Sequence, residues 1–152
     1  MGRNKYPEET VTKILDAALE LFCAQGYEGT SIQDIVDRLD GMTKGAVYHH
    51  FKSKEEIFNA AFDRAMAPIV ERRRSTLGIG TITGAQKLKR LYAPESVVPQ
   101  IELWARMHPA ADPVKSSRLL AMQYQGSFDE SADGNLLPVI EEGIADGSIA
   151  CE

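Results

Sequence analysis

The sequence predicts an all-α protein. Apolar residues recur at three- and four-residue spacing along most of the 152 residues, and strand-like alternation is not found with confidence anywhere. Helix start and stop signals separate these apolar stretches, with serine or threonine in front of them and glycine or proline behind. The expected organisation is a compact N-terminal unit of three helices, followed by a helical bundle that the chain enters through a fourth, longer helix.

The composition suits one domain, or a small domain fused to a larger one. A hydrophobic fraction of 43% is enough for a core, and no run of 18 apolar residues predicts a membrane span. The N-terminus is polar and does not resemble a signal peptide. Cys23 and Cys151 suit a reducing compartment, and no Cys/His cluster has zinc spacing. We therefore expect a cytoplasmic protein that uses neither a membrane nor a metal or cofactor.

The first expected helix covers about residues 8–25. Its apolar residues follow the i, i+3, i+4 rule and form one stripe. Pro7 suits the first turn, and the carboxylates of Glu8 and Glu9 complement the positive end of the helix dipole. Gly26 is a good C-terminal stop.

Two short helices are expected next. The first of them opens at Thr30–Ser31, where either hydroxyl can serve as the N-cap, and it runs to Leu39 before Gly41 ends it. The second begins at Thr43, another N-cap residue, and ends near residues 50–51.

The fourth expected helix starts after Ser53, which precedes Glu56 by three residues in capping-box spacing. It continues past Pro68, where a kink is expected, to about residue 74. Residues 77–84 are rich in glycine and predict a loop. Weaker helical patterns follow it, over residues 86–92, 96–107, 114–128 and 135–145.

The two short helices form a helix-turn-helix pattern, in which the second helix enters the major groove of DNA. Lys44 is suited to guanine O6/N7 or to a phosphate, and Gly45 leaves room for the helix backbone to approach the DNA. No acidic residue lies between Asp40 and Glu55, so this segment is locally positive in a chain of net charge −5. The alternative is an ordinary helical hairpin whose aromatic residues belong to the core.

The stretch from Val11 to Phe62 resembles the DNA-binding domain of the tetracycline-repressor (TetR/AcrR) family. This resemblance covers about a third of the chain and implies an all-helical homodimer that represses transcription from a palindromic operator. It also implies a C-terminal domain that binds a small-molecule effector and thereby releases the DNA. The segments that carry the resemblance are Ile14-Leu15-Asp16-Ala17-Ala18, Leu21-Phe22, Gly26-Tyr27-Glu28-Gly29-Thr30-Ser31-Ile32, Asp34-Ile35 and residues 43–58.

The resemblance also implies which residues contact DNA and where the domains divide. A DNA-binding domain over residues 1–52 and a ligand-binding and dimerisation domain over residues 53–152 are expected. Side chains at the start of the second helix and of the fourth match phosphate contacts, and those of the third match the recognition helix. The implied DNA contacts are Thr30, Ser31, Thr43, Lys44, Gly45, Tyr48, His49 and Lys54.

The second half of the chain has no motif of comparable strength. By analogy it holds the effector pocket, although an aromatic residue or a methionine at helical spacing is more often part of the core. Trp104 and His108 lie one turn apart and can share a helix face. The candidate pocket residues are Phe62, Met66, Trp104, His108, Tyr124 and Phe128.

Two departures from the family pattern are visible. The spacing from Ile35 to Gly41 is one residue longer than usual, so the turn is expected to be longer. Family members are also longer at the C-terminus, where their last two helices form the dimer interface. These two helices are expected to be missing here, which leaves dimerisation through other surfaces or a truncated product as alternatives.

Two other classes of function are weighed against DNA binding. A helical protein-interaction module that no longer binds DNA is the main alternative. An enzyme is not expected, because the chain shows neither suitably placed paired carboxylates nor a nucleophile motif nor a phosphate-binding loop.

Overall fold

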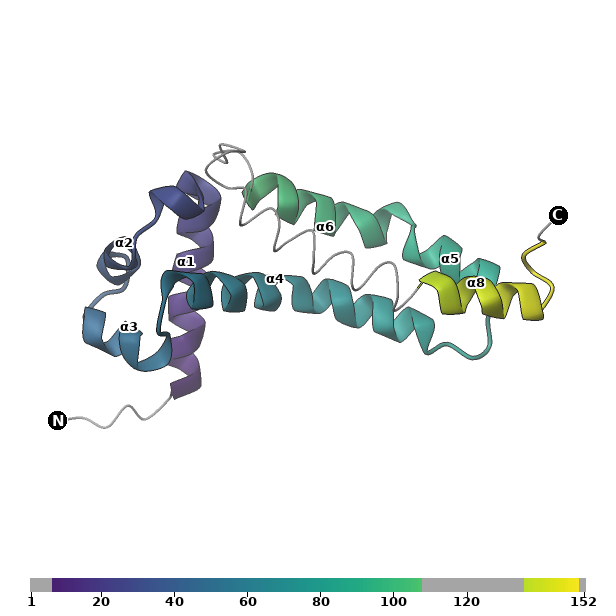
Figure 1. The fold of residues 1–152 in the computed structure, drawn as a ribbon, viewed down its shortest axis with the longest axis horizontal. Coiled ribbons are helices and arrows are strands. Elements are labelled where there is room, and N and C mark those ends of the chain that lie inside the picture. The colour runs from purple at the N-terminus through teal and green to yellow at the C-terminus, as the bar shows by residue number, and fades with distance from the viewer. Residues whose placement is uncertain (1–6, 108–135, 151–152) are drawn as a thin grey trace. The chain divides into compact units, whose positions relative to one another are not determined.

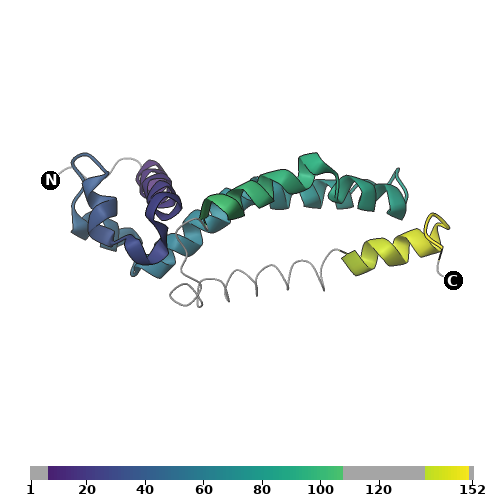
Figure 2. The same ribbon diagram turned by 90° about the horizontal axis from the view of Figure 1, so that it is seen from above.

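The structure, a computed structural model, describes residues 7–107 and 136–150 (Figures 1 and 2). Every regular element in these two ranges is a helix, which confirms the all-α prediction. None of the helices in the described ranges is long and apolar enough to cross a membrane. The predicted helix over residues 114–128 lies outside the described residues.

The described residues divide into two compact units. Residues 7–65 and 104–107 belong to the first unit, and residues 66–103 and 136–150 belong to the second. The predicted domain boundary between residues 52 and 53 stays a prediction.

The first unit contains α1 (Pro7–Gly29), α2 (Ile32–Asp37), α3 (Lys44–His50) and the start of α4 (Lys54–Leu77). Figure 1 shows α2 and α3 on the same side of α1. The backbone of Gly26 has φ 79° and ψ 168°, which interrupts α1 near its C-terminal end, where the sequence predicts a stop.

Helix α2 is shorter than predicted. It ends at Asp37 rather than at Leu39, because the chain tightens into a turn in which the N–H of Leu39 donates to the carbonyl of Val36 at 3.0 Å. Gly41 follows with φ 73°, a conformation that suits glycine, and the chain then enters α3.

The core of the first unit is organised around three aromatic rings. Phe22 is 1% exposed, and its ring centroid lies 5.7 Å from that of Tyr27 and 5.1 Å from that of Phe58. The rings of Tyr27 and Phe58 meet edge to face at 5.3 Å, so the end of α1 packs against the start of α4. Other fully buried side chains of this unit come from each of its helices: Ile14, Ile35, Val47 and Ile57.

Arg64 fastens α4 to α1 inside the first unit. Its Nη1 lies 2.9 Å from the carboxylate of Asp16 and donates to the carbonyl of Thr12 at 3.1 Å. Beyond this residue α4 continues through Pro68 and ends at Leu77, a few residues later than predicted.

The second unit contains the end of α4 with α5 (Gly84–Leu91), α8 (Leu136–Ala145) and most of α6 (Pro94–Met107). Arg72 of α4 donates to the carbonyl of Glu95 at 2.7 Å, which joins α4 to the start of α6. Helix α5 lies beside α8. It begins two residues earlier than predicted.

The aromatic core gives a first prediction. Replacing Phe22 with alanine removes a ring that is almost completely buried, and it should destabilise the protein by about 3–5 kcal/mol. Leu137→Ala is the control, because Leu137 is 55% exposed and its loss should change the free energy of unfolding by no more than about 0.5 kcal/mol. Denaturant unfolding followed by circular dichroism measures both; equal losses would contradict this description of the core.

Candidate nucleic-acid interface

Helix α3 begins at the predicted N-cap. Thr43 has an extended backbone, and its Oγ1 accepts the N–H of Ala46 at 3.2 Å. The helix has only seven residues, which is too short to be stable by itself. Val47 is fully buried, and Phe51, directly after the helix, is buried as well, so α3 is held by one face against the core.

The opposite face of α3 is open to solvent. Lys44, Gly45 and His49 are exposed, and Tyr48 is 46% exposed. Lys44 and Tyr48 are four residues apart, so they lie one turn from each other along the same face. A cation, a phenol and an imidazole are thus presented beside a residue without a side chain.

The segment that contains α3 has no negatively charged side chain. No acidic residue occurs from Gly41 to Lys54, whereas Lys44, Lys52 and Lys54 are cationic. At the start of α4, the carboxylate of Glu56 accepts the N–H of Lys52 at 2.6 Å. The region is therefore suited to a negatively charged partner such as a phosphate backbone.

Lys54 is held in place at the start of α4. Its Nζ donates to the carbonyl of Tyr27 at 2.8 Å and lies 4.2 Å from the centroid of the Tyr27 ring. An ammonium group has three hydrogens, so this bond leaves donors for a phosphate. The role of Tyr27 in positioning Lys54 is not predicted by the sequence, because the two residues are 27 positions apart and no local pattern links them.

The start of α4 differs in one detail from a capping box. Ser53 Oγ accepts the N–H of Glu56 at 3.1 Å, as the spacing predicts. The carboxylate of Glu56 binds the N–H of Lys52 instead of that of Ser53, one residue further out.

The two hydroxyls predicted at the start of α2 have different environments. Ser31 is exposed and forms a full capping box with Asp34, whose carboxylate accepts the N–H of Ser31 at 2.7 Å. Thr30 is only 1% exposed, and its Oγ1 donates to the carbonyl of Gly26 at 2.8 Å. We therefore correct one expectation: the Thr30 side chain holds the end of α1 and does not reach the surface, and Ser31 remains the candidate phosphate contact.

The structure thus brings together most of the predicted DNA-contacting side chains. Helices α2 and α3 contact each other in the first unit, and the segment that joins α3 to α4 is three residues long. The exposed positions come from the starts of three helices and from the outer face of α3: Ser31, Thr43, Lys44, Gly45, Tyr48, His49 and the partly exposed Lys54.

The predicted effector pocket is described only in part. Phe62 is half-buried in the first unit, and its ring stacks on that of Phe58 with centroids 6.3 Å apart. Met66 is buried in the second unit. His108, Tyr124 and Phe128 lie outside the described residues, as does the side chain of Trp104. Within residues 7–107 and 136–150, no three histidine, cysteine, aspartate or glutamate side chains gather as a metal site.

A short helix that is capped, packed on one side and exposed on the other, preceded by a second short helix, defines a helix-turn-helix protein. Residues 14–61 match the family model described as "Bacterial regulatory proteins, tetR family". Over these residues the chain carries the DNA-binding region of the TetR/AcrR family of transcriptional regulators.

Two relatives and one solved structure illustrate the similarity. The chain is 44% identical over 62 residues to the HTH-type transcriptional regulator SrpR of Pseudomonas putida, covering 41% of this chain and 29% of that protein. It is 32% identical over 117 residues to the uncharacterized HTH-type transcriptional regulator YezE of Bacillus subtilis, covering 66% and 59%. The matches thus span less than two thirds of either relative.

The structure is also similar to the crystal structure of PfmR, a TetR family transcriptional regulator from Thermus thermophilus. The TM-score is 0.62 at 28% identity, over 91% of this chain and 74% of that chain. This similarity extends beyond the helix-turn-helix and supports the all-helical fold of the residues that the structure describes.

The capping box of α2 gives a prediction about pH. Hydrogen bonds from Ser31, first of all from its backbone N–H, lower the pKa of Asp34. Because the pKa is lower in the folded state, this carboxylate stabilises the fold above about pH 4, and the contribution is lost as the pH falls through the folded pKa. Asp34→Asn should therefore lose less stability between about pH 5 and pH 2 than the parent chain.

Unfolding in denaturant at a series of pH values measures this difference. Gly80→Ala, which changes an exposed residue without a titratable group, is the control and should keep the parent's pH dependence. Parallel curves for Asp34→Asn and the parent would show that the capping box has no such effect.

Proposed function

We propose that the protein is a transcriptional regulator that binds double-stranded DNA through the outer face of α3 and is released from it by a small molecule. The observation that carries the proposal is the division of α3 into two faces. Val47 is buried in the core, while Lys44, Gly45 and Tyr48 are exposed in a segment, residues 41–54, that contains no acidic residue. Repression of transcription is the simplest outcome, because a protein in the groove of a promoter blocks access to it.

In the proposed complex the N-terminal half of α3 enters the major groove. Lys44 donates to guanine O6/N7 or to a phosphate, and Gly45 allows the helix backbone to lie close to the bases. Ser31, Tyr48 and Lys54 donate to phosphates on either side and fix the position of the helix on the duplex. The hydrogen bond from Lys54 to Tyr27 fixes the direction of this ammonium before the DNA arrives.

Two copies of the chain acting together would read a palindromic operator. Their α3 helices would enter successive major grooves, about 34–36 Å apart. The resemblance to the family supports this homodimer.

An effector would act by favouring an arrangement with a different spacing, and DNA affinity would fall by the ratio of its affinities for the two states. Helix α4 is suited to link the two events, because its residues belong to both units. The effector is proposed to bind in the expected ligand-binding domain, over residues 53–152, as the resemblance to the family implies.

Substitutions on the outer face of α3 test the DNA-binding site. Lys44→Ala and Tyr48→Ala should each weaken binding about tenfold or more to a duplex carrying the palindrome upstream of the chain's own gene. Lys44→Ala should also reduce the slope of log affinity against log salt by about 1. Fluorescence anisotropy at several salt concentrations measures both quantities, and thermal unfolding checks that the fold is kept.

The control for these variants is Lys89→Ala, which removes an exposed cation from α5 in the second unit. Its affinity should equal that of the parent chain. DNA binding that persists in the folded Lys44→Ala/Tyr48→Ala double variant would rule out this site.

Replacing Gly45 should have opposite effects on the stability of the fold and on the affinity for DNA. A Cβ at this position would meet only Thr43 Oγ1, at 3.9 Å, so alanine fits the free protein. Gly45→Ala should stabilise the fold by about 0.5–1 kcal/mol, because glycine is costly in a helix, and yet weaken DNA binding through a clash with the base pairs. Gly80→Ala is the control, since a Cβ there meets nothing within 4 Å and should leave the affinity unchanged. Unchanged affinity for Gly45→Ala would show that α3 does not approach the bases closely.

A further inference from the structure

The N-terminus of α5 is completed by a distant part of the chain. An α-helix leaves its first four N–H groups without partners inside the helix. In α5 two of them are satisfied by the capping box: the N–H of Gln86 donates to Thr83 Oγ1 at 3.3 Å, and the N–H of Thr83 donates to Gln86 Oε1 at 3.1 Å. The other two, from Gly84 and Ala85, bind residues that lie 62 and 63 positions further along the chain.

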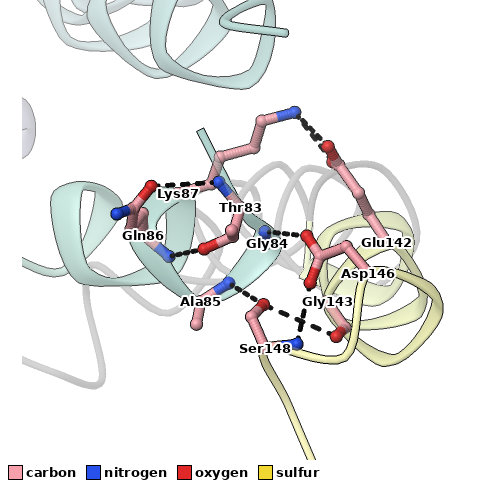
Figure 3. A network of polar contacts seen from close by, with 9 residues as sticks. All are labelled: Thr83, Gly84, Ala85, Gln86, Lys87, Glu142, Gly143, Asp146 and Ser148. Atoms are coloured by element: carbon pink, nitrogen blue, oxygen red, sulfur yellow. Dashed lines mark hydrogen bonds and ion pairs between the residues drawn. The ribbon is translucent and has the colours of Figure 1, made fainter. Parts of the chain in front are cut away.

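Those partners lie in the turn that follows α8 (Figure 3). Asp146 Oδ2 accepts the N–H of Gly84 at 2.8 Å, and Ser148 Oγ accepts the N–H of Ala85 at 3.1 Å. Asp146 Oδ1 accepts the N–H of Ser148 at 2.8 Å, which fixes the turn itself. The hydrogen bonds from Ser148 and Gly84 lower the pKa of Asp146, so the carboxylate is charged at neutral pH.

An ion pair between a buried lysine and a partly exposed glutamate joins α5 to α8 one turn further along. Lys87 of α5 is 5% exposed, and its Nζ lies 2.7 Å from both carboxylate oxygens of Glu142 in α8. A buried ammonium without its carboxylate would be costly, because it would lose both water and counter-charge. Lys87 can therefore remain buried only while Glu142 is in place.

Close backbone packing leaves little freedom at this junction. A Cβ on Gly84 would lie 2.6 Å from the carbonyl oxygen of Val139, and a Cβ on Gly143 would lie 2.6 Å from Cγ1 of Ile149. Glycine at these two positions thus allows α5, α8 and the chain after α8 to pack together.

We propose that residues 142–149 form a strap that makes α5 a conditional helix: α5 is ordered only while the strap is docked, and the two open as one local unit. A helix of eight residues is marginal alone, and the strap supplies two of its four N-terminal acceptors and the partner of its buried lysine. Displacement of the strap releases α5 and with it residues 78–83, which connect α4 to α5. All of these contacts lie in the second unit, so the proposal does not depend on DNA binding.

Hydrogen exchange of the 152-residue chain tests this coupling. Asp146→Ala/Ser148→Ala removes both distant acceptors, and the amides of residues 84–91 should exchange roughly tenfold faster or more. The amides of residues 43–50 should be unaffected. Glu141→Ala removes an exposed carboxylate from the same helix, α8, and should leave α5 protected. Unchanged exchange in α5 of the double variant would overturn the proposal.

Labelling of Lys87 provides a second readout. Acetic anhydride, followed by mass spectrometry, should modify Lys87 slowly in the parent chain because its amine is buried, and roughly tenfold faster in the double variant. Lys44, which is exposed, should react at the same rate in both. Ser148→Thr keeps the hydroxyl and should keep Lys87 protected. If residues 43–50 lose protection together with α5, the variant has opened the whole fold and the strap is not a local device.

Discussion

A helix of seven residues does not hold its shape in water, and the account of this protein rests on how α3 is held. Thr43 satisfies an N–H at its start, and Val47 and Phe51 pack into the core of the first unit. These contacts use one face and one end of the helix only. The other face, with Lys44, Gly45 and Tyr48, is therefore presented to solvent in a fixed orientation without taking part in the fold, which is what a surface for recognising DNA requires.

The same dependence on neighbours recurs at the other short helices. Helix α2 relies on the capping box between Ser31 and Asp34, and α5 takes half of its N-terminal acceptors from the strap after α8. In the first unit, the ring of Tyr27 packs against that of Phe22. Lys54 in turn donates a hydrogen bond to the carbonyl of Tyr27 and lies over its ring. Polar side chains at the helix ends thus have two roles: they cap the helices, and they are the proposed contacts with phosphate.

The sequence predicts the features that depend on neighbouring residues, which are the helix positions and the helix-turn-helix motif. Periodicity and capping residues located α1, α3, α4, α6 and α8 to within a few residues, and the motif over residues 43–58 indicated the family. The sequence does not show whether the Thr30 hydroxyl points outward or back to a carbonyl, and in the structure it donates to the carbonyl of Gly26. The hydrogen bond from Lys54 to Tyr27 spans 27 positions of the chain, and the bonds between the strap and α5 span 62 and 63 positions. No local sequence pattern indicates partners that are so far apart.

The central claim is that DNA meets this protein at the outer face of α3. The most direct test is a nuclear magnetic resonance titration of the isotope-labelled chain with a duplex selected from a random pool for binding. The account predicts that amide shifts concentrate in residues 43–50 and at Lys54, with residues 84–91 unmoved at the same DNA concentration. Shifts elsewhere in the chain, with residues 43–50 unmoved in a saturated complex, would contradict it.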